Sequence, residues 1–278
     1  MGSFLANTLY NGDMRLLFGL GGLFLPLCAL AVVPGNDSDT NTLDYNFVGT
    51  LNGASGVLIG ADLVLTAKHV GAGTFNLPGI GSFNMIANSA VSDPNSDLTL
   101  FRIDTGGMTL QHATIDVSQM IAGDTVTMVG YGWSGKLNGS GTGYDINVAP
   151  GVRRKADAIY EFTDYIEDVP NNYLAGFSLI APLRQNGQGA LAGGDSGGGW
   201  FRNGMLVGTN AFVGTYGNGV DYQFSASSTD MFVSGAISLS DNVQFLRDNN
   251  VAMVPEPASL AVLGLGVIAL ARRRRKVA

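Results

Sequence analysis

The chain has few of the residues that cross-link proteins or bind metals. Among its 278 residues there is one cysteine, Cys28, so no disulfide can form within the chain. There are two histidines, and only 13% of the residues are charged. The sequence contains neither a cysteine and histidine cluster with metal-ligand spacing nor a glycine-rich phosphate loop, so it predicts no metal and no cofactor.

Basic residues are also scarce, and most of the chain is more acidic than its net charge of −7 indicates. Of the 15 lysines and arginines, Arg15 and the five basic residues of 272–276 lie near the ends, which leaves nine in the body of the chain. Of the 22 acids, only Asp13 lies outside that body. Nucleic-acid phosphates require a basic surface, so we expect no nucleic-acid partner.

Short apolar segments separated by turn-forming residues make up most of the sequence. Hydrophobic residues account for 46% of the chain, and there are 40 glycines. Runs such as "LVLTAKHV", "LTLFRI" and "TVTMVGYGW" are rich in β-branched residues and bounded by Gly, Asn, Asp or Ser. Segments with helical periodicity are few. This pattern predicts an all-β fold, either a sandwich or a barrel.

The N-terminus has the features of an export signal. Arg15 precedes the apolar run "LLFGLGGLFLPLCALAVV", which includes the small-x-small sequence of 29–31. We therefore expect residues 1–31 to form a signal peptide that signal peptidase removes together with Cys28. A true start at Met14 would give this signal peptide its usual short basic front.

The C-terminus combines three features in a fixed order. Val254–Pro257 reads "VPEP", the apolar run 258–271 follows, and 272–276 are basic. This order resembles the PEP-CTERM sorting signal, and we assign it to residues 251–278. The resemblance implies cutting by an exosortase-type membrane enzyme, transient membrane contact of both termini, and delivery to the surface of a Gram-negative bacterium. A plain membrane anchor is the alternative, although a run of 14 residues is short for a hydrocarbon core of about 30 Å.

The stretch "LAGGDSGGGW" contains Ser196 among glycines, between two apolar segments. A serine hydroxyl is a weak nucleophile that needs a histidine to take its proton and, in most enzymes, a carboxylate to orient that histidine. His69 ends the apolar run "LVLTAKHV", from which a side chain can project. His112 has no such context, and we interpret it as a surface or strand histidine.

The order of these residues along the chain separates the known serine hydrolase arrangements. The α/β-hydrolase elbow requires a histidine after the serine, and none follows Ser196. A subtilisin order with Asp62 requires an α/β pattern that the chain lacks. The remaining order is histidine, acid, serine, for which the best acid is Asp97, because Asp93 precedes Pro94 and fits a turn.

Three ordered motifs resemble the chymotrypsin/trypsin-like serine protease family. Thr66–His69 reads "TAKH", Asp97–Leu100 reads "DLTL", and Gly194–Gly198 reads "GDSGG". The similarity extends over residues 45–248. It implies two antiparallel six-stranded β-barrels followed by a short C-terminal helix, and we assign residues 32–250 to this protease domain.

The resemblance also implies a role for each residue of the site. His69 would act as general base and then acid, Asp97 would orient it, and Ser196 would form an acyl-enzyme with a protein or peptide substrate. The backbone amides of Gly194 and Ser196 would form the oxyanion hole.

Substrate specificity follows less directly from the sequence. The family's acidic pocket base is replaced by Ala190, and Val213 stands where a glycine would leave room for a large side chain. These residues favour small or medium apolar side chains before the cut. Alternatively, matching Phe232 to a late aromatic strand residue would bring Asp230 near the pocket and favour basic side chains. The resemblance assigns these residues to the pocket: Ala190, Ala211, Phe212 and Val213.

Two alternatives concern the residue before the serine, Asp195. In animal members of the family this aspartate pairs with a new N-terminal ammonium, and cleavage after Ala31 would place such an ammonium on Val32. Otherwise internal hydrogen bonds hold Asp195, and residues 32–44 form a polar lead.

The sequence thus predicts a secreted serine endopeptidase of the periplasm, cell surface or extracellular matrix. An inactive homologue that acts as a cell-surface binding module is the first alternative. A structural matrix protein is the second, because a sorting signal is combined with Gly- and Asn-rich loops.

Overall fold

The computed structural model describes residues 32–33, 44–137, 144–168, 173–183, 188–216, 222–223 and 231–254. The expected signal peptide and nearly all of the expected sorting segment lie outside these residues. Among the residues that are described, no helix is long and apolar enough to cross a membrane.

The first of two large sheets is antiparallel and has the order β5-β4-β1-β2-β3-β7-β6. A bridge between Met85 and Ile103 joins the segment after β5 to the end of β7, so the sheet closes into a barrel. Its strands are β1 Val48–Leu51, β2 Ala54–Leu58, β3 Leu63–Ala67, β4 Phe75–Leu77, β5 Gly81–Phe83, β6 Val91–Ser92 and β7 Leu98–Arg102.

The second sheet has ten strands, with the path β12-β9-β15-β16-β18-β14-β13 and β8, β17 and β19 at its margins. Only two residues separate β12 from β13, so the two ends of this path are one bent segment and the sheet closes as well. Its strands are β8 Ile115–Asp116, β9 Thr125–Gly130, β12 Arg154–Ile159, β13 Phe162–Asp168, β14 Tyr173–Pro182, β15 Gly199–Arg202, β16 Met205–Tyr216, β17 Tyr222–Gln223, β18 Met231–Ser238 and β19 Met253–Val254.

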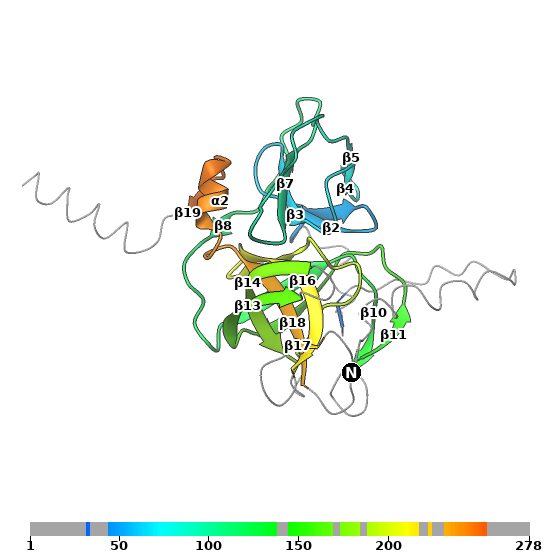
Figure 1. Cartoon of the computed structure of the whole chain (residues 1–278). Coiled ribbons are helices and arrows are strands. Elements are labelled where there is room, and N and C mark those ends of the chain that lie inside the picture. Colours follow the sequence, from blue (N-terminus) through cyan, green and yellow to red (C-terminus); the bar gives the residue numbers. More distant parts are fainter. Residues whose placement is uncertain are drawn as a thin grey trace, which may run out of the picture.

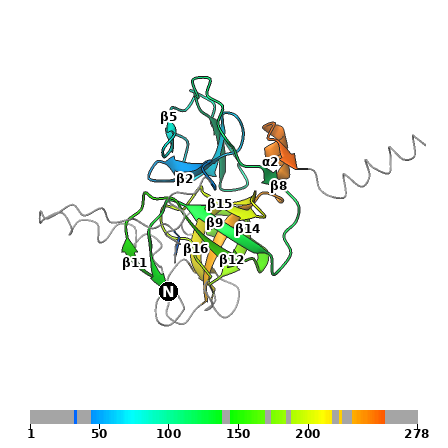
Figure 2. The same ribbon diagram turned by 180° about the vertical axis from the view of Figure 1, so that it is seen from behind.

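The all-β prediction with two antiparallel barrels is confirmed. Counting β12 and β13 as one bent strand, six principal strands form the second barrel, and the short marginal strands raise the number above six. Figure 1 shows the first barrel, in blue and cyan, above the second, and Figure 2 shows the same arrangement from behind. A separate hairpin consists of β10 Ser134–Leu137 and β11 Tyr144–Val148.

The expected short C-terminal helix is α2, Val243–Asp248. It buries Leu246 and is followed by β19, which pairs in parallel with β8. Both views show α2 beside β8 (Figures 1 and 2). The sheet thus includes residues up to Val254, four residues beyond the expected domain boundary at 250.

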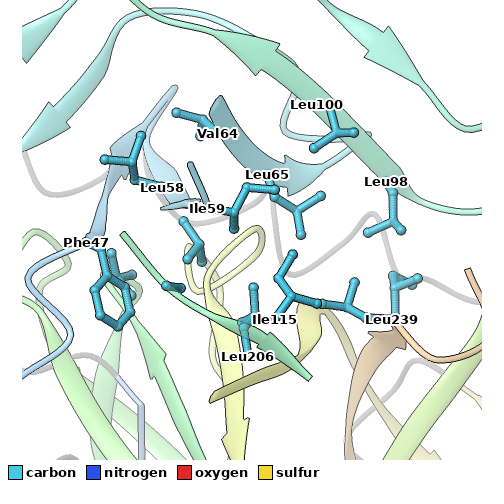
Figure 3. Close-up of a cluster of buried hydrophobic side chains, with 14 of the residues drawn as sticks. Phe47, Leu58, Ile59, Val64, Leu65, Leu98, Leu100, Ile115, Leu206 and Leu239 are labelled. Carbon is cyan, nitrogen blue, oxygen red and sulfur yellow. The ribbon is translucent and has the colours of Figure 1, made fainter. Parts of the chain in front are cut away.

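One hydrophobic core extends through the contact between the two barrels. Leu58 and Leu65 of the first barrel and Leu206 of the second belong to the same buried cluster, with relative exposures of 0%. Figure 3 shows these side chains converging, together with Ile115 of β8. Burial of this apolar surface fixes the two barrels against each other, which is a requirement for a site assembled from both.

Candidate active site

His69 and Asp97 lie side by side because β3 and β7 are antiparallel neighbours. The register pairs Ala67 with Leu98, so the residues just beyond these strand ends are adjacent. The Asp97 carboxylate accepts hydrogen bonds from His69 Nδ1 at 2.6 Å and from the His69 amide at 2.9 Å. Its side chain is 3% exposed, whereas that of His69 is 38% exposed. Since a carboxylate only accepts, the proton of the neutral imidazole lies on Nδ1, and Nε2 is left as the base.

Ser196 lies on the turn before β15 and is held against the first barrel. The amide of Ser55, in β2, donates to the Ser196 carbonyl at 2.9 Å. Gly197 has a φ of 82°, and a Cβ atom there would collide with the Ser55 carbonyl oxygen and the Thr66 hydroxyl, so only glycine fits. Because Thr66 is in β3, three residues before His69, the turn brings Ser196 to the histidine end of that strand.

His69 and Ser196 both belong to the described part of the chain, and no hydrogen bond joins the imidazole to the Ser196 hydroxyl. Catalytic hydrogen bonds are often long or poorly aligned without substrate, so the arrangement is compatible with proton transfer after substrate binding.

The backbone that leads into Ser196 carries two amides without a hydrogen-bond acceptor among the described residues. The Trp133 amide donates to the Gly193 carbonyl at 2.8 Å, and in a trans peptide this turns the Gly194 amide the opposite way. Ser55 Oγ donates to the Gly194 carbonyl at 3.0 Å. Among the described residues, neither the Gly194 amide nor the Ser196 amide donates a hydrogen bond within the chain. These two amides are therefore available to an oxyanion.

The carboxyl group of Asp195 is fully buried beneath this loop. It accepts hydrogen bonds from the amides of Gly132 and Ala192, each at 2.8 Å, and from the backbone amide of Val32. Burial raises the pKa of Asp195 from 3.8 to about 7, although these hydrogen bonds and the positive charge of Arg154 act to lower it.

Val32 is fully buried in the same place, although it follows the expected signal peptide directly. Its carbonyl accepts a hydrogen bond from Ser134 Oγ at 2.6 Å, and Val33 forms a bridge with Ala190. The φ of Val32 is 61°, which is a strained value for a β-branched residue. Residues 32 and 33 therefore do not form part of a polar lead.

The expected pocket residues fall into two groups. Ala190 and the partly buried Val213 pack in a cluster with Leu183 and Phe232, and this cluster is apolar. Ala211 and Phe212 belong instead to the main core. Asp230, the alternative pocket residue, lies outside the described residues.

Two further expectations concern the other candidate residues. His112 is exposed, and its ring nitrogen contacts only the neighbouring Ala113 carbonyl at 3.3 Å among the described residues. Asp93 caps its own turn, since it accepts hydrogen bonds from the Asn95 amide and the Ser96 hydroxyl. In the parts of the chain that the structure describes, no group of three or more His, Cys, Asp or Glu side chains could hold a metal ion.

Sequence reasoning missed Tyr173. Its hydroxyl donates to Asp97 Oδ2 at 2.9 Å, the oxygen that also accepts from His69. Tyr173 is 76 residues from Asp97 in a strand without a motif, so no local signal in one sequence could have identified it.

Two parts of the chain match known protein families. Residues 54–208 match the trypsin-like peptidase domain, and residues 254–276 match the PEP-CTERM protein-sorting motif. No curated protein sequence matches the chain significantly.

Two similar solved structures, both described as inactive forms, are the Rv3671c protease and a serine-to-alanine mutant of Rv3671c from M. tuberculosis H37Rv. Each has 16% identity and a TM-score of 0.50. The alignments cover 76% and 80% of this chain and 92% and 97% of the other chains, respectively. At this identity the likeness supports the fold alone.

Proposed function

The chain belongs to the trypsin-like peptidase family, and from this premise we propose that it is an exported serine endopeptidase that acts through Ser196, His69 and Asp97. The observation that carries the proposal is the hydrogen bond of 2.6 Å between His69 Nδ1 and a buried Asp97 carboxylate, beside a serine turn with two available amides. A serine turn with a purely structural role would need neither the histidine–aspartate hydrogen bond nor the available amides.

In the proposed reaction, His69 Nε2 takes the proton of Ser196 Oγ as that oxygen attacks the scissile carbonyl carbon. The imidazolium, stabilised by Asp97, then gives this proton to the departing amine nitrogen as the peptide C–N bond breaks. The acyl group is left as an ester on Ser196. Water, deprotonated by the same Nε2, attacks this ester and releases the carboxyl product and the free serine.

The amides of Gly194 and Ser196 would stabilise the negative oxygen that develops in both steps. In comparable sites, each such donor stabilises the transition state by about 3 to 4 kcal/mol. Ser55 supports this arrangement because its hydroxyl accepts from the Tyr131 amide at 2.9 Å and donates to the Gly194 carbonyl. The first barrel thereby holds the loop of the second.

The proposed specificity is for small or medium apolar side chains before the cut. Ala190 and Val213 share an apolar cluster with Leu183 and Phe232, and none of these four side chains carries a negative charge that could form an ion pair with a basic group. A long side chain would have to displace Val213.

The sorting motif implies export across the inner membrane, to the cell surface or the extracellular space. We further propose that signal peptidase removes residues 1–31, that 32–250 form the peptidase domain together with strand β19 of the following segment, and that an exosortase-type enzyme processes 251–278. The final location, whether periplasm, surface or matrix, depends on that last cut.

Signal-peptide removal would also complete the site. A cut after Ala31 creates an ammonium group on Val32, whose nitrogen already faces the buried Asp195 carboxyl. Asp195 precedes the nucleophile, so an ion pair there would stabilise the turn that carries Ser196. The enzyme would then become active on export.

Labelling with a fluorophosphonate, which reacts with activated serines, tests the proposed function. The processed wild-type protein should be labelled, and peptide mapping should locate the label on Ser196. The variant Ser196→Ala should not be labelled, whereas Ser82→Ala, which alters an exposed serine of β5, should be labelled at the wild-type rate. No labelling of the wild-type protein would favour a binding module.

A further inference from the structure

The Asp97 carboxylate has a third donor that comes from the second barrel. Oδ1 accepts from the His69 amide, whereas Oδ2 accepts both from His69 Nδ1 and from the Tyr173 hydroxyl, at 2.6 and 2.9 Å. The Tyr173 ring stands edge-on to the imidazole, with centroids 5.9 Å apart and planes inclined at 77°. One phenol thus contacts both partners of the histidine–aspartate pair.

The fold holds this phenol in place by direct backbone contact between the barrels. Tyr173 is the first residue of β14, and two residues later the Ala175 carbonyl accepts a hydrogen bond from the Asp97 amide at 3.2 Å. At Gly176 the approach is so close that a Cβ atom would lie 2.8 Å from the Asn95 carbonyl oxygen. The start of β14 therefore packs against the loop that carries Asp97.

We propose that Tyr173 is a positioning residue of the proposed peptidase, which fixes the Asp97 carboxylate and limits the negative charge that this carboxylate presents to His69. A hydrogen bond donated to Oδ2 withdraws negative charge from the oxygen that faces the imidazole. It also restrains rotation of the carboxylate, and with it the plane of the histidine ring. This inference rests on the proposed function.

The phenol is suited to this role over the whole working range of pH. Burial, and then the neighbouring charge of Asp97, raise the pKa of Tyr173 well above the ordinary value for a tyrosine. The hydroxyl therefore keeps its proton and remains a donor at neutral and mildly alkaline pH.

Other charged side chains around the His69–Asp97 pair have contacts of their own. On the first barrel, Lys68 Nζ donates to the Asp93 carbonyl at 2.9 Å, and the Asp93 carboxylate is held by its own turn. On the second barrel, Asp195 is buried beneath the serine turn. A change in His69 titration on removing this hydroxyl is therefore not expected to come from Lys68, Asp93 or Asp195.

The variant Tyr173→Phe removes the hydroxyl and retains the ring. In the background Ser196→Ala, titration of His69 by NMR is simple because the chain has only two histidines, and His112 serves as an internal reference. Without the donor, more negative charge faces the imidazolium, so the midpoint of the NMR titration of His69 should move to higher pH, whereas the His112 signal should titrate as it does in the parent protein.

Activity gives a second readout in the otherwise wild-type chain. Tyr173→Phe should shift the acidic limb of the pH profile of fluorophosphonate labelling to higher pH, by the same amount as the NMR titration midpoint of His69. It should also lower the labelling rate on the plateau of this profile about tenfold. Tyr165→Phe is the matched control, because this exposed tyrosine lies on the partner strand β13. It should alter neither readout.

An unchanged His69 titration and an unchanged acidic limb in Tyr173→Phe would overturn the proposal, even if the labelling rate fell, since loss of packing alone would lower the rate. Failure of the proposed function is distinguishable. In that case the wild-type protein would not be labelled at all, while the NMR titration would still report whether Tyr173 acts on His69.

Discussion

The pairing of Val32 with Asp195 predicts that stability depends on pH differently before and after the signal peptide is removed. In the uncut chain, a peptide N–H of Val32 faces the buried carboxyl, and the pKa of Asp195 rises from 3.8 to about 7. Each pH unit of difference between folded and unfolded pKa corresponds to about 1.4 kcal/mol. The rise is therefore equivalent to about 4 kcal/mol, a large part of the usual stability of about 5 to 15 kcal/mol.

The sign of this pH dependence is set by whether the folded or the unfolded chain holds the Asp195 proton more tightly. Below pH 4 both the folded and the unfolded chain carry it. Between pH 4 and 7 the unfolded chain has released the proton from Asp195 whereas the folded chain retains it, so stability falls as the pH rises. Above pH 7 both states are ionised and the loss is complete.

Cleavage after Ala31 should remove most of this loss. An ammonium on Val32 lowers the pKa of Asp195, because an adjacent positive charge favours the carboxylate. Cleavage also relieves backbone strain. The φ of Val32, 61°, is defined by the carbonyl carbon of the preceding residue, and a left-handed conformation of this kind costs about 1 to 3 kcal/mol. Without that carbon the constraint disappears.

The assay is denaturant unfolding from pH 4.5 to 8 of two forms, one beginning at Val32 and one beginning at Ala31. The variant Ser196→Ala prevents self-cleavage in both. The side chains of the two forms are identical apart from Ala31, so the difference between the two curves reports how the N-terminal ammonium interacts with Asp195. The Val32 form should be the more stable, and the difference in unfolding free energy between the two forms should increase from pH 5 to 7. The variant Asp195→Asn should remove this increase. Parallel curves would refute the ammonium mechanism and favour retention of Asp195 by backbone hydrogen bonds alone.

Three further predictions concern catalysis, specificity and processing. Ser196→Ala and His69→Ala should each abolish peptide hydrolysis, with little added loss in the double variant, and Asp97→Asn should lower kcat about 10⁴-fold; additive losses would contradict a shared proton relay. Val213→Gly should improve kcat/KM for large apolar side chains over small ones, and an unchanged preference would remove Val213 from the pocket. Mass spectrometry of the mature surface protein should find no arginine cluster, whereas an intact end at Ala278 would exclude processing.

The sequence is informative where chemistry is encoded locally. The runs "LVLTAKHV" and "LTLFRI", which are rich in β-branched residues and bounded by turn formers, predict two strands, and the pairing of these strands places His69 beside Asp97. The glycines of the "GDSGG" turn were also interpretable, because Gly197 packs where no side chain fits. The strands and the family membership are therefore recoverable from one sequence.

Contacts between the barrels could not be predicted in this way. Ser55 and Gly194 are 139 residues apart, and Tyr173 and Asp97 are 76 apart. The roles of Ser55 and Tyr173 depend on how the two closed sheets pack against each other, which no local pattern encodes. The burial of Val32 also depends on packing between segments that are far apart in the sequence. The sequence left it open between a polar lead and a partner of Asp195, and only the packing of the second barrel distinguishes the two.

Digestion of a defined peptide library by the purified, processed protein, with the new ends identified by mass spectrometry, tests the central claim most directly. We expect the wild-type sample to contain cuts that follow small or medium apolar residues, and the Ser196→Ala sample to contain none. Absence of cleavage by the wild-type protein, or equal cleavage by both proteins, would contradict a serine endopeptidase acting through Ser196.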